Sequence, residues 1–283
     1  MIKLIATDLD GTLFYPKRKL TLMTRKNAEF LKDFYHAGGK VVLVTGRNYL
    51  IASKVEHKLG IPISIVGCNG SFVYENGKYV ETFPMDNEKV FNMYNYLKGK
   101  FGIGIWMVFD STDSLKITVQ IGGKIIQCGA IIGNALNFSY AEKFINGEKP
   151  FINAITNNTL YKLMPVFGIN KEACKNAAQA KMALEDLYGN DFTIVQSKNA
   201  MEITKKGVNK ADSLKKYLEL IGVKEDEVAV IGDSENDITM FDNFKNSFVM
   251  SHAKDFVKAK ANTEVEGVFS LRDYVLTEDG KLK

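Results

Sequence analysis

The sequence predicts an α/β protein in which a parallel sheet, covered by helices, is interrupted by an inserted α+β domain. Short apolar segments alternate with amphipathic helical segments near both ends of the chain, which is typical of a parallel sheet with helices on both faces. This alternation stops near residue 83 and returns near residue 191. With 283 residues, 46% of them hydrophobic, the chain is long enough for one large domain or two modest ones.

The first third of the chain supplies the clearest strand and helix signals. IKLIAT is apolar and β-branched, as expected of a buried strand. Residues 25–37 carry apolar side chains at helical spacing, with Thr24 as a cap and Gly38 as an end signal. KVVLVTG then predicts a second strand, residues 48–59 a helix stopped by Gly60, and ISIVGCNG a third strand.

The pattern then changes. FVYENGKYV contains Asn76-Gly77, a strong signal for a two-residue hairpin. Beyond it, NEKVFNMYNYLKG and residues 171–188 predict helices, and GIGIWMVF, LKITVQI and KLMPVFGI predict strands. VNKADSLKKYLELIG, VAVIGDS and NDITMFDNF then restore the helix and strand alternation. The predicted division is a first core segment over 1–82, an inserted domain over 83–190 and a second core segment over 191–283.

Composition narrows the choice of partners and compartment. The formal net charge is +4 and the lysines are scattered, so we expect no nucleic-acid partner. No apolar run approaches the ~20 residues that cross a bilayer, and the start lacks a secretory leader, so we expect no membrane association. Cys68, Cys128 and Cys174 are far apart and without metal spacing, which favours buried thiols and a reducing, cytoplasmic location. The pattern does not indicate an oligomeric state.

The first candidate for chemistry is IATDLDGTLF, where a buried strand ends in two carboxylates followed by Gly-Thr. The two-residue period of a strand allows Asp8 and Asp10 to point the same way at its carboxyl end, where open α/β sheets bind ligands. Two close carboxylates repel, which raises one pKa, so the pair can supply a nucleophile and a proton donor. The alternative is that these aspartates only cap a turn beside Gly11.

Two further predicted strands end in polar residues. LVTGR places the Thr45 hydroxyl and the amides around Gly46 where an anion could bind. VAVIGDSENDITMF supplies Asp233 and Asp237, and hard cations such as Mg²⁺ prefer carboxylate oxygens from a few rigid points. The alternative for the acidic pair is helix capping.

Lys210 runs against the usual charge preference of helices. In KKGVNKADSL, Asn209 is the predicted helix cap, so Lys210 falls in the first turn, where the helix dipole disfavours a cation. A nearby anion would explain it, and a solvated lysine is the alternative. Taken together, the strand ends and this helix start could surround a phosphoryl group and its Mg²⁺.

These motifs resemble a known family. DLDGT, TGR, Lys210 and GDSEND are similar, in order, to the four motifs of the haloacid dehalogenase superfamily. The insertion resembles the cap of its Cof-type sugar-phosphate phosphatases, and CNGSFVYENG and EITKKGVNKADSL are further matches. The resemblance implies a Rossmann-like core with an α+β cap, and a Mg²⁺-dependent hydrolase of small phosphate esters, sugar phosphates above all.

The resemblance also implies roles for single residues. Asp8 attacks phosphorus and forms an aspartyl-phosphate, and Asp10 is the general acid and base. Mg²⁺ is held by the Asp8 carboxylate, the Asp10 main-chain carbonyl and Asp233, with Asp237 orienting its waters. The implied phosphate- and substrate-binding residues are Thr45, Gly46, Arg47, Lys210 and Asn236.

The sequence departs from the family pattern at two places. Ser251-His252-Ala253 stands where Cof-like proteins usually have Gly-Asn-Ala, and Ala211 follows the lysine where Gly is common. Neither change removes a catalytic group, but His252 could alter the rim of the site. Two alternative functions stay open: a phosphomutase of the phosphomannomutase type, and a phospho-ligand binding protein without turnover.

Overall fold

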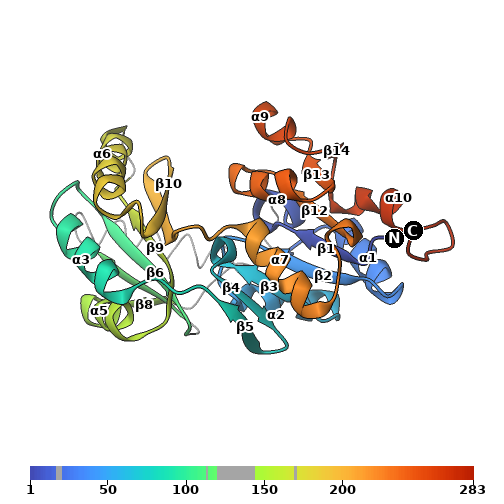
Figure 1. Ribbon diagram of the computed structural model, residues 1–283, viewed down its shortest axis with the longest axis horizontal. Coiled ribbons are helices and arrows are strands. Elements are labelled where there is room, and N and C mark those ends of the chain that lie inside the picture. Colours follow the sequence, from blue (N-terminus) through green and yellow to red (C-terminus); the bar gives the residue numbers. More distant parts are fainter. Residues whose placement is uncertain (17–20, 113, 120–143, 169–170) are drawn as a thin grey trace. The chain divides into compact units, whose positions relative to one another are not determined.

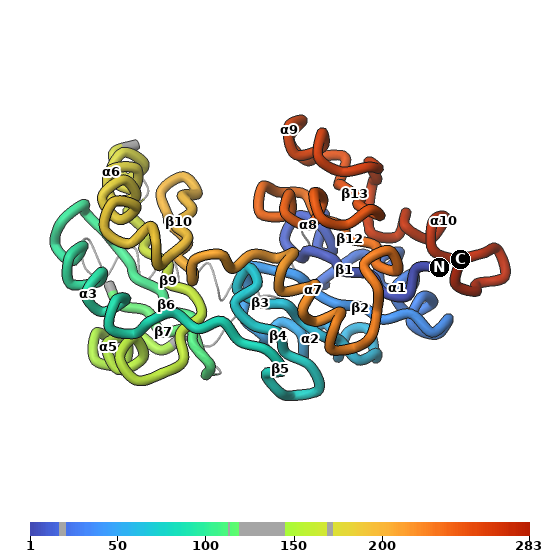
Figure 2. Tube along the Cα trace, in the orientation of Figure 1, coloured from blue at the N-terminus to red at the C-terminus, as the bar shows by residue number. Residues whose placement is uncertain are grey.

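The computed structural model describes residues 1–16, 21–112, 114–119, 144–168 and 171–283. The chain forms two compact units (Figure 1). Met1–Thr82 and Asn209–Lys283 together make the first, here called the core unit, and Phe83–Val208 make the second, the inserted unit. The two chain ends meet in the core unit, where the Ile2 amide donates to the Lys283 carbonyl (Figure 2).

The core unit is built on an eight-stranded sheet in the order β14-β13-β12-β1-β2-β3-β4-β5. Neighbours from β14 to β3 are parallel, and β4 and β5 add an antiparallel hairpin. The central strands are buried along their length, as expected for parallel strands covered on both faces. The strands are β1 (Leu4–Thr7), β2 (Lys40–Val44), β3 (Ser64–Gly67), β4 (Phe72–Glu75), β5 (Lys78–Thr82), β12 (Val228–Gly232), β13 (Asn246–Met250) and β14 (Thr263–Val265).

The helix cap, the helix end and the hairpin turn that the sequence predicts for this unit are all found in the structure. The Thr24 hydroxyl accepts from the Asn27 amide at the start of α1, and Gly60 ends α2 in the left-handed conformation. Asn76 and Gly77 both have positive φ, 48° and 79°, and form the predicted hairpin turn. The helices of the core unit are α1 (Arg25–His36), α2 (Leu50–Leu59), α7 (Lys210–Ile221), α8 (Ile238–Asn243), α9 (Asp255–Lys258) and α10 (Arg272–Val275).

The inserted unit has a six-stranded sheet in the order β10-β11-β9-β6-β7-β8. Its apolar core includes Trp106, which is fully buried, with Tyr94 and Phe151 packed beside it at ring-centroid distances of 5.0 and 6.4 Å. The elements are β6 (Ile105–Asp110), β7 (Leu115–Val119), β8 (Phe144–Asn146), β9 (Leu160–Val166), β10 (Phe192–Ser197), β11 (Ala200–Lys205), α3 (Asn87–Leu97), α5 (Glu148–Asn157) and α6 (Lys171–Tyr188).

The return to the core comes later than the sequence suggests. Residues 191–208, expected to begin the second core segment, belong to the inserted unit. The reason is strand pairing: β10 pairs with β11, and Ile203 of β11 lies opposite Leu163 of β9 in the second sheet. Ile203 is also fully buried in the apolar core of that unit.

Two expectations from composition can be compared with the structure. Cys68 is buried as expected, but Cys174 is exposed on α6, so the expectation of a buried thiol is wrong there. Cys128 lies outside the described residues. Within the part of the chain that the structure describes, no helix combines the length and the apolar character that crossing a bilayer requires.

Candidate active site

Every site residue predicted from the sequence lies in the core unit. The motif loops follow the carboxyl ends of the central strands of its sheet. Strands β12, β1 and β2 are parallel neighbours, with Thr7 opposite both Ile231 and Leu43, so their carboxyl ends are level. The loops that follow these strands begin at Asp8, Thr45 and Asp233, which brings the three motifs together. This edge is where open α/β sheets bind their ligands.

Lys210 joins two of these loops. Its Nζ donates to Asp8 Oδ1 at 2.7 Å and to Asp237 Oδ1 at 2.6 Å, and the residue is only 1% exposed. The solvated lysine considered as an alternative is therefore wrong, and the unusual cation at the start of α7 is explained by two buried carboxylates. Burial by itself lowers the pKa of Lys210, but the Asp237 and Asp8 charges outweigh it and hold that pKa above its ordinary value.

Asp8 is buried close to other charged side chains. Burial raises the pKa of its carboxyl to about 8, with Lys210 opposing the rise and the Asp237 and Asp233 carboxylates adding to it. A raised pKa was expected, but the expected cause, repulsion by Asp10, is wrong. The like charges that act on Asp8 come from the loop after β12, whereas the Asp10 side chain is paired elsewhere.

Gly11 and Thr12, which follow Asp10, both lie against the side chain of Asp233. The Thr12 hydroxyl donates to Asp233 Oδ1 at 2.9 Å. Gly11 has a φ of +91°, and a Cβ built there would lie 2.3 Å from Asp233 Oδ2, so both the backbone conformation and the close approach require glycine. Thr12, for which no separate role was predicted, therefore orients a candidate metal ligand. The pKa of Asp233 is raised chiefly by burial, against the lowering effect of the Thr12 hydrogen bond.

Asp237 has two functions at once. Its Oδ2 accepts from the backbone amides of Asp233 and Ser234, each at 3.0 Å, so it caps the turn as the simple alternative supposed. Its Oδ1 is bound to Lys210. With both oxygens engaged, Asp237 holds the loop and the lysine in place, which suits the water-orienting role that the family resemblance implies.

Asp10 is held by Arg47 rather than turned toward Asp8. The Arg47 guanidinium donates to both Asp10 oxygens, at 2.5 and 2.8 Å, in a bidentate pair. The Arg47 amide in turn donates to the Thr45 hydroxyl at 3.2 Å, and Thr45 is buried. The Asp10 side chain is 56% exposed, so it lies at the open side of the site.

Asn69 is a residue of this site that the sequence analysis did not single out. Its side-chain oxygen accepts from Asn236 Nδ2 at 3.2 Å and lies 3.0 Å from where a Cβ on Gly46 would be. Cys68 and Asn69 both have positive φ, 48° and 59°, an uncommon conformation that persists only when the surroundings impose it. The Asn-Gly of CNG was a usable signal, because asparagine tolerates this conformation.

The acidic residues fit a divalent cation. Asp8, Asp233 and Asp237 each offer a carboxylate oxygen, and these oxygens lie within 4.8 Å of one another. When all three carboxylates are ionised, Lys210 compensates only one of their negative charges. A hard divalent ion such as Mg²⁺, which prefers carboxylate oxygens, would balance the rest.

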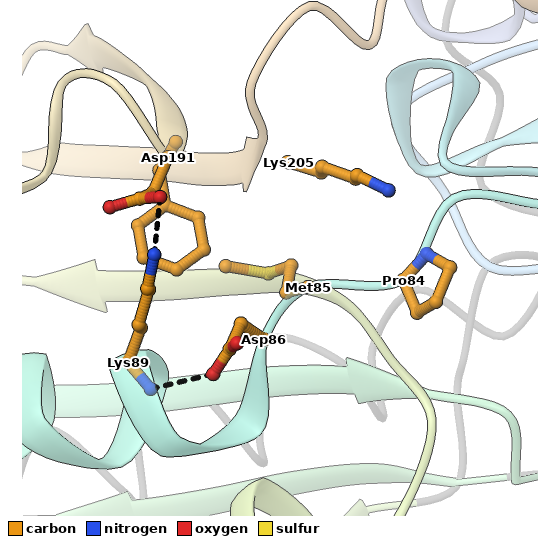
Figure 3. A pocket seen from close by; sticks show the side chains of 7 residues that line it. Pro84, Met85, Asp86, Lys89, Asp191 and Lys205 are labelled. Carbon is orange, nitrogen blue, oxygen red and sulfur yellow. Dashed lines mark hydrogen bonds and ion pairs between the residues drawn. The ribbon is translucent and has the colours of Figure 1, made fainter.

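A separate pocket of about 350 Å³ lies in the inserted unit. Figure 3 shows Lys89 and Asp191 pointing toward one another there, while Lys205 extends away from them. Lys89 Nζ lies 2.5 Å from Asp191 Oδ1, and Asp86 caps α3 by accepting from the Lys89 amide. The Lys89 and Asp191 charges thus compensate one another, whereas the cluster of Asp8, Asp233 and Asp237 in the core unit carries more acidic than basic charge.

The carboxyl ends of this sheet bring together a buried lysine and three aspartates, the kinds of group that enzymes acting on phosphate esters use as nucleophile, fixed positive charge and metal ligands. A model of the family described as haloacid dehalogenase-like hydrolase matches residues 5–267. The chain belongs to this family, and it is a phosphoric monoester hydrolase with a Rossmann-like core and an inserted cap, here the core unit and the inserted unit.

Curated relatives and solved structures agree with this assignment. The chain is 24% identical over 279 residues to phosphatase YwpJ of Bacillus subtilis, covering 92% of this chain and 93% of the relative. It is 26% identical over 264 residues to 5-amino-6-(5-phospho-D-ribitylamino)uracil phosphatase YcsE of the same organism, covering 92% and 88%. The crystal structure of TM0651 from Thermotoga maritima shares the fold, with a TM-score of 0.78 at 20% identity over 98% of this chain and 99% of that one.

Proposed function

We propose that this hydrolase is a Mg²⁺-dependent phosphatase of small phosphorylated metabolites, sugar phosphates among them, and that it works through an aspartyl-phosphate on Asp8. The observation that carries the proposal is the contact of Lys210 with both Asp8 and Asp237 beside Asp233. This cluster offers a nucleophile, a fixed positive charge and cation ligands within one buried site.

In the first step, an Asp8 carboxylate oxygen attacks phosphorus while the bond from phosphorus to the ester oxygen breaks. Lys210 stabilises the negative phosphoryl oxygens, and the Thr45 hydroxyl and the Gly46 amide donate to them. Asp10 gives its proton to the departing oxygen. Since Arg47 binds both Asp10 oxygens in the structure, this role requires that pair to open, and the substrate phosphate is a competing anion for Arg47.

In the second step, Asp10 takes a proton from water as the water attacks phosphorus and the bond to Asp8 breaks. Free Asp8 and inorganic phosphate result, and Asp10 is ready to donate again. A bound divalent cation would supply charge neutralisation at the phosphoryl group. Asp8, Asp233 and the Asp10 main-chain carbonyl are the groups that we propose hold it, with Asp237 orienting its waters, and Asn236 is proposed to contact the substrate.

The relatives support a small metabolite as the substrate. The name of YcsE describes a phosphatase of a phosphoribityl compound, in which a sugar-alcohol chain carries the phosphate. On these grounds we place sugar phosphates and related polyol phosphates first among the substrates to examine.

The decisive experiment measures phosphate release from a panel of sugar phosphates, nucleotides and cofactor phosphates, with Mg²⁺ and with chelator. We expect release from several small esters only when Mg²⁺ is present. Full activity in chelator would refute the metal assignment. Isomerisation of a sugar phosphate that requires a bisphosphate activator, with little net phosphate release, would favour the mutase, and binding without any turnover would favour the non-catalytic alternative.

A further inference from the structure

His252 stands at the same edge of the core sheet as the acidic cluster. It follows β13, which pairs with β12 so that Val249 lies opposite Gly232, the residue before Asp233. The backbone on either side is fixed, because Ser251 donates to the Val265 carbonyl and Ala253 to the Met250 carbonyl. The imidazole is therefore presented to the Asp233 loop by a rigid turn.

The imidazole faces the oxygen of Asp233 that Thr12 does not bind. His252 Nε2 lies 3.8 Å from Asp233 Oδ2, while Thr12 donates to Oδ1. The ring is stacked on Tyr15, with centroids 3.9 Å apart and an interplanar angle of 23°, which fixes its plane. This distance is about 1 Å longer than a hydrogen bond, so the role proposed below requires the imidazole and the carboxylate to move closer together.

We propose that His252 is a positioning residue for the metal site: it holds Asp233 from the side opposite Thr12 and so increases the affinity of the core unit for a divalent cation. This inference rests on the metal site of the proposed function. A carboxylate ligand held by hydrogen bonds on both oxygens has little freedom to rotate, so less order must be gained when the cation binds.

The test measures cation binding directly, without substrate. Mn²⁺, whose free concentration is read by electron paramagnetic resonance, and Mg²⁺, by calorimetry, are titrated into the whole chain. We expect His252→Ala to bind both ions about 10-fold or more weakly, in the range seen when partners of metal ligands are removed. His252→Gln, whose amide can donate at similar reach, is expected to stay within about threefold of wild type, and Tyr15→Phe, which keeps the stacked ring, to bind as wild type.

The matched control is His57→Ala on α2, which removes an imidazole outside the motif loops and is expected to leave binding unchanged. Melting temperatures of the metal-free variants separate lost affinity from lost folding. Wild-type affinity in His252→Ala, or equal losses in His252→Ala and His252→Gln, would overturn the proposed role of His252. A wild-type protein that binds neither ion would overturn the metal site itself, and with it this inference.

Discussion

Replacing Asp8 by asparagine is expected to abolish turnover and, at the same time, to stabilise the metal-free protein. The nucleophile is lost because an amide does not attack phosphorus. The gain in stability follows from the burial of Asp8 between other carboxylates, which disfavours its ionised form in the folded state. Asparagine has nearly the same shape without the charge, and Lys210 keeps its contact with Asp237.

The size of this gain in unfolding free energy can be worked out from the raised pKa of Asp8. Burial raises the pKa of Asp8 from 3.8 to about 8, and each pKa unit corresponds to about 1.4 kcal/mol. The full rise therefore gives an upper limit of about 6 kcal/mol. Water entry and relaxation reduce such penalties, so we expect a gain of about 2–3 kcal/mol, or about 5–10 °C in melting temperature.

The stability difference between the wild type and Asp8→Asn depends on pH. The folded-state pKa of Asp8 lies above its unfolded value, so between about pH 4 and pH 8 unfolding releases a proton. Wild-type stability falls as pH rises through this window, and Asp8→Asn lacks that contribution. The difference between the two proteins should be near zero at pH 4, grow with pH and level off above about pH 8.

The assay is thermal and urea unfolding of both proteins in chelator from pH 4 to pH 9, with phosphate release measured in parallel with Mg²⁺. Asp10→Asn is the matched control, because it removes a carboxylate that is exposed and paired with Arg47 instead of one buried among other acidic groups. Added Mg²⁺ should stabilise the wild type more than Asp8→Asn. A variant that is less stable than the wild type at pH 8 in chelator, or that retains activity, would refute the reasoning.

Three further predictions concern the same site. Asp10→Asn should slow single-turnover phosphorylation of Asp8 more for a sugar phosphate than for p-nitrophenyl phosphate, because the p-nitrophenol leaving group needs little protonation. If the variant phosphorylates Asp8 at the wild-type rate from both substrates, Asp10 is not the general acid. Excess Ca²⁺ should inhibit the Mg²⁺-loaded enzyme in phosphate-release assays, since its larger coordination shell misplaces the attacking oxygen, and undiminished activity would contradict this. Gly11→Ala should weaken Mg²⁺ binding at least about 10-fold by calorimetry, because the added Cβ would meet the Asp233 carboxylate, and wild-type affinity would show that the loop accommodates it.

The sequence alone determined the local features of the fold. The Thr24 cap, the left-handed Gly60 and the Asn76-Gly77 turn depend on residues close in the chain, so they can be recognised without a structure. The same is true of the loops that end β1, β2 and β12, since buried strands followed by polar residues mark the carboxyl edge of a parallel sheet.

Tertiary structure decided which partners these elements find. Residues 192–205 contain strands β10 and β11, and long-range pairing of β11 with β9 assigns them to the inserted unit. Likewise, a lysine at a helix start is solvated in most helices, and only the packing of α7 against the loops after β1 and β12 buries Lys210 between Asp8 and Asp237. Periodicity and capping report interactions within a few residues. The choice of sheet depends instead on the pairing of Ile203 with Leu163, and the burial of the Lys210 charge on its contact with Asp8, which is 202 residues away in the chain.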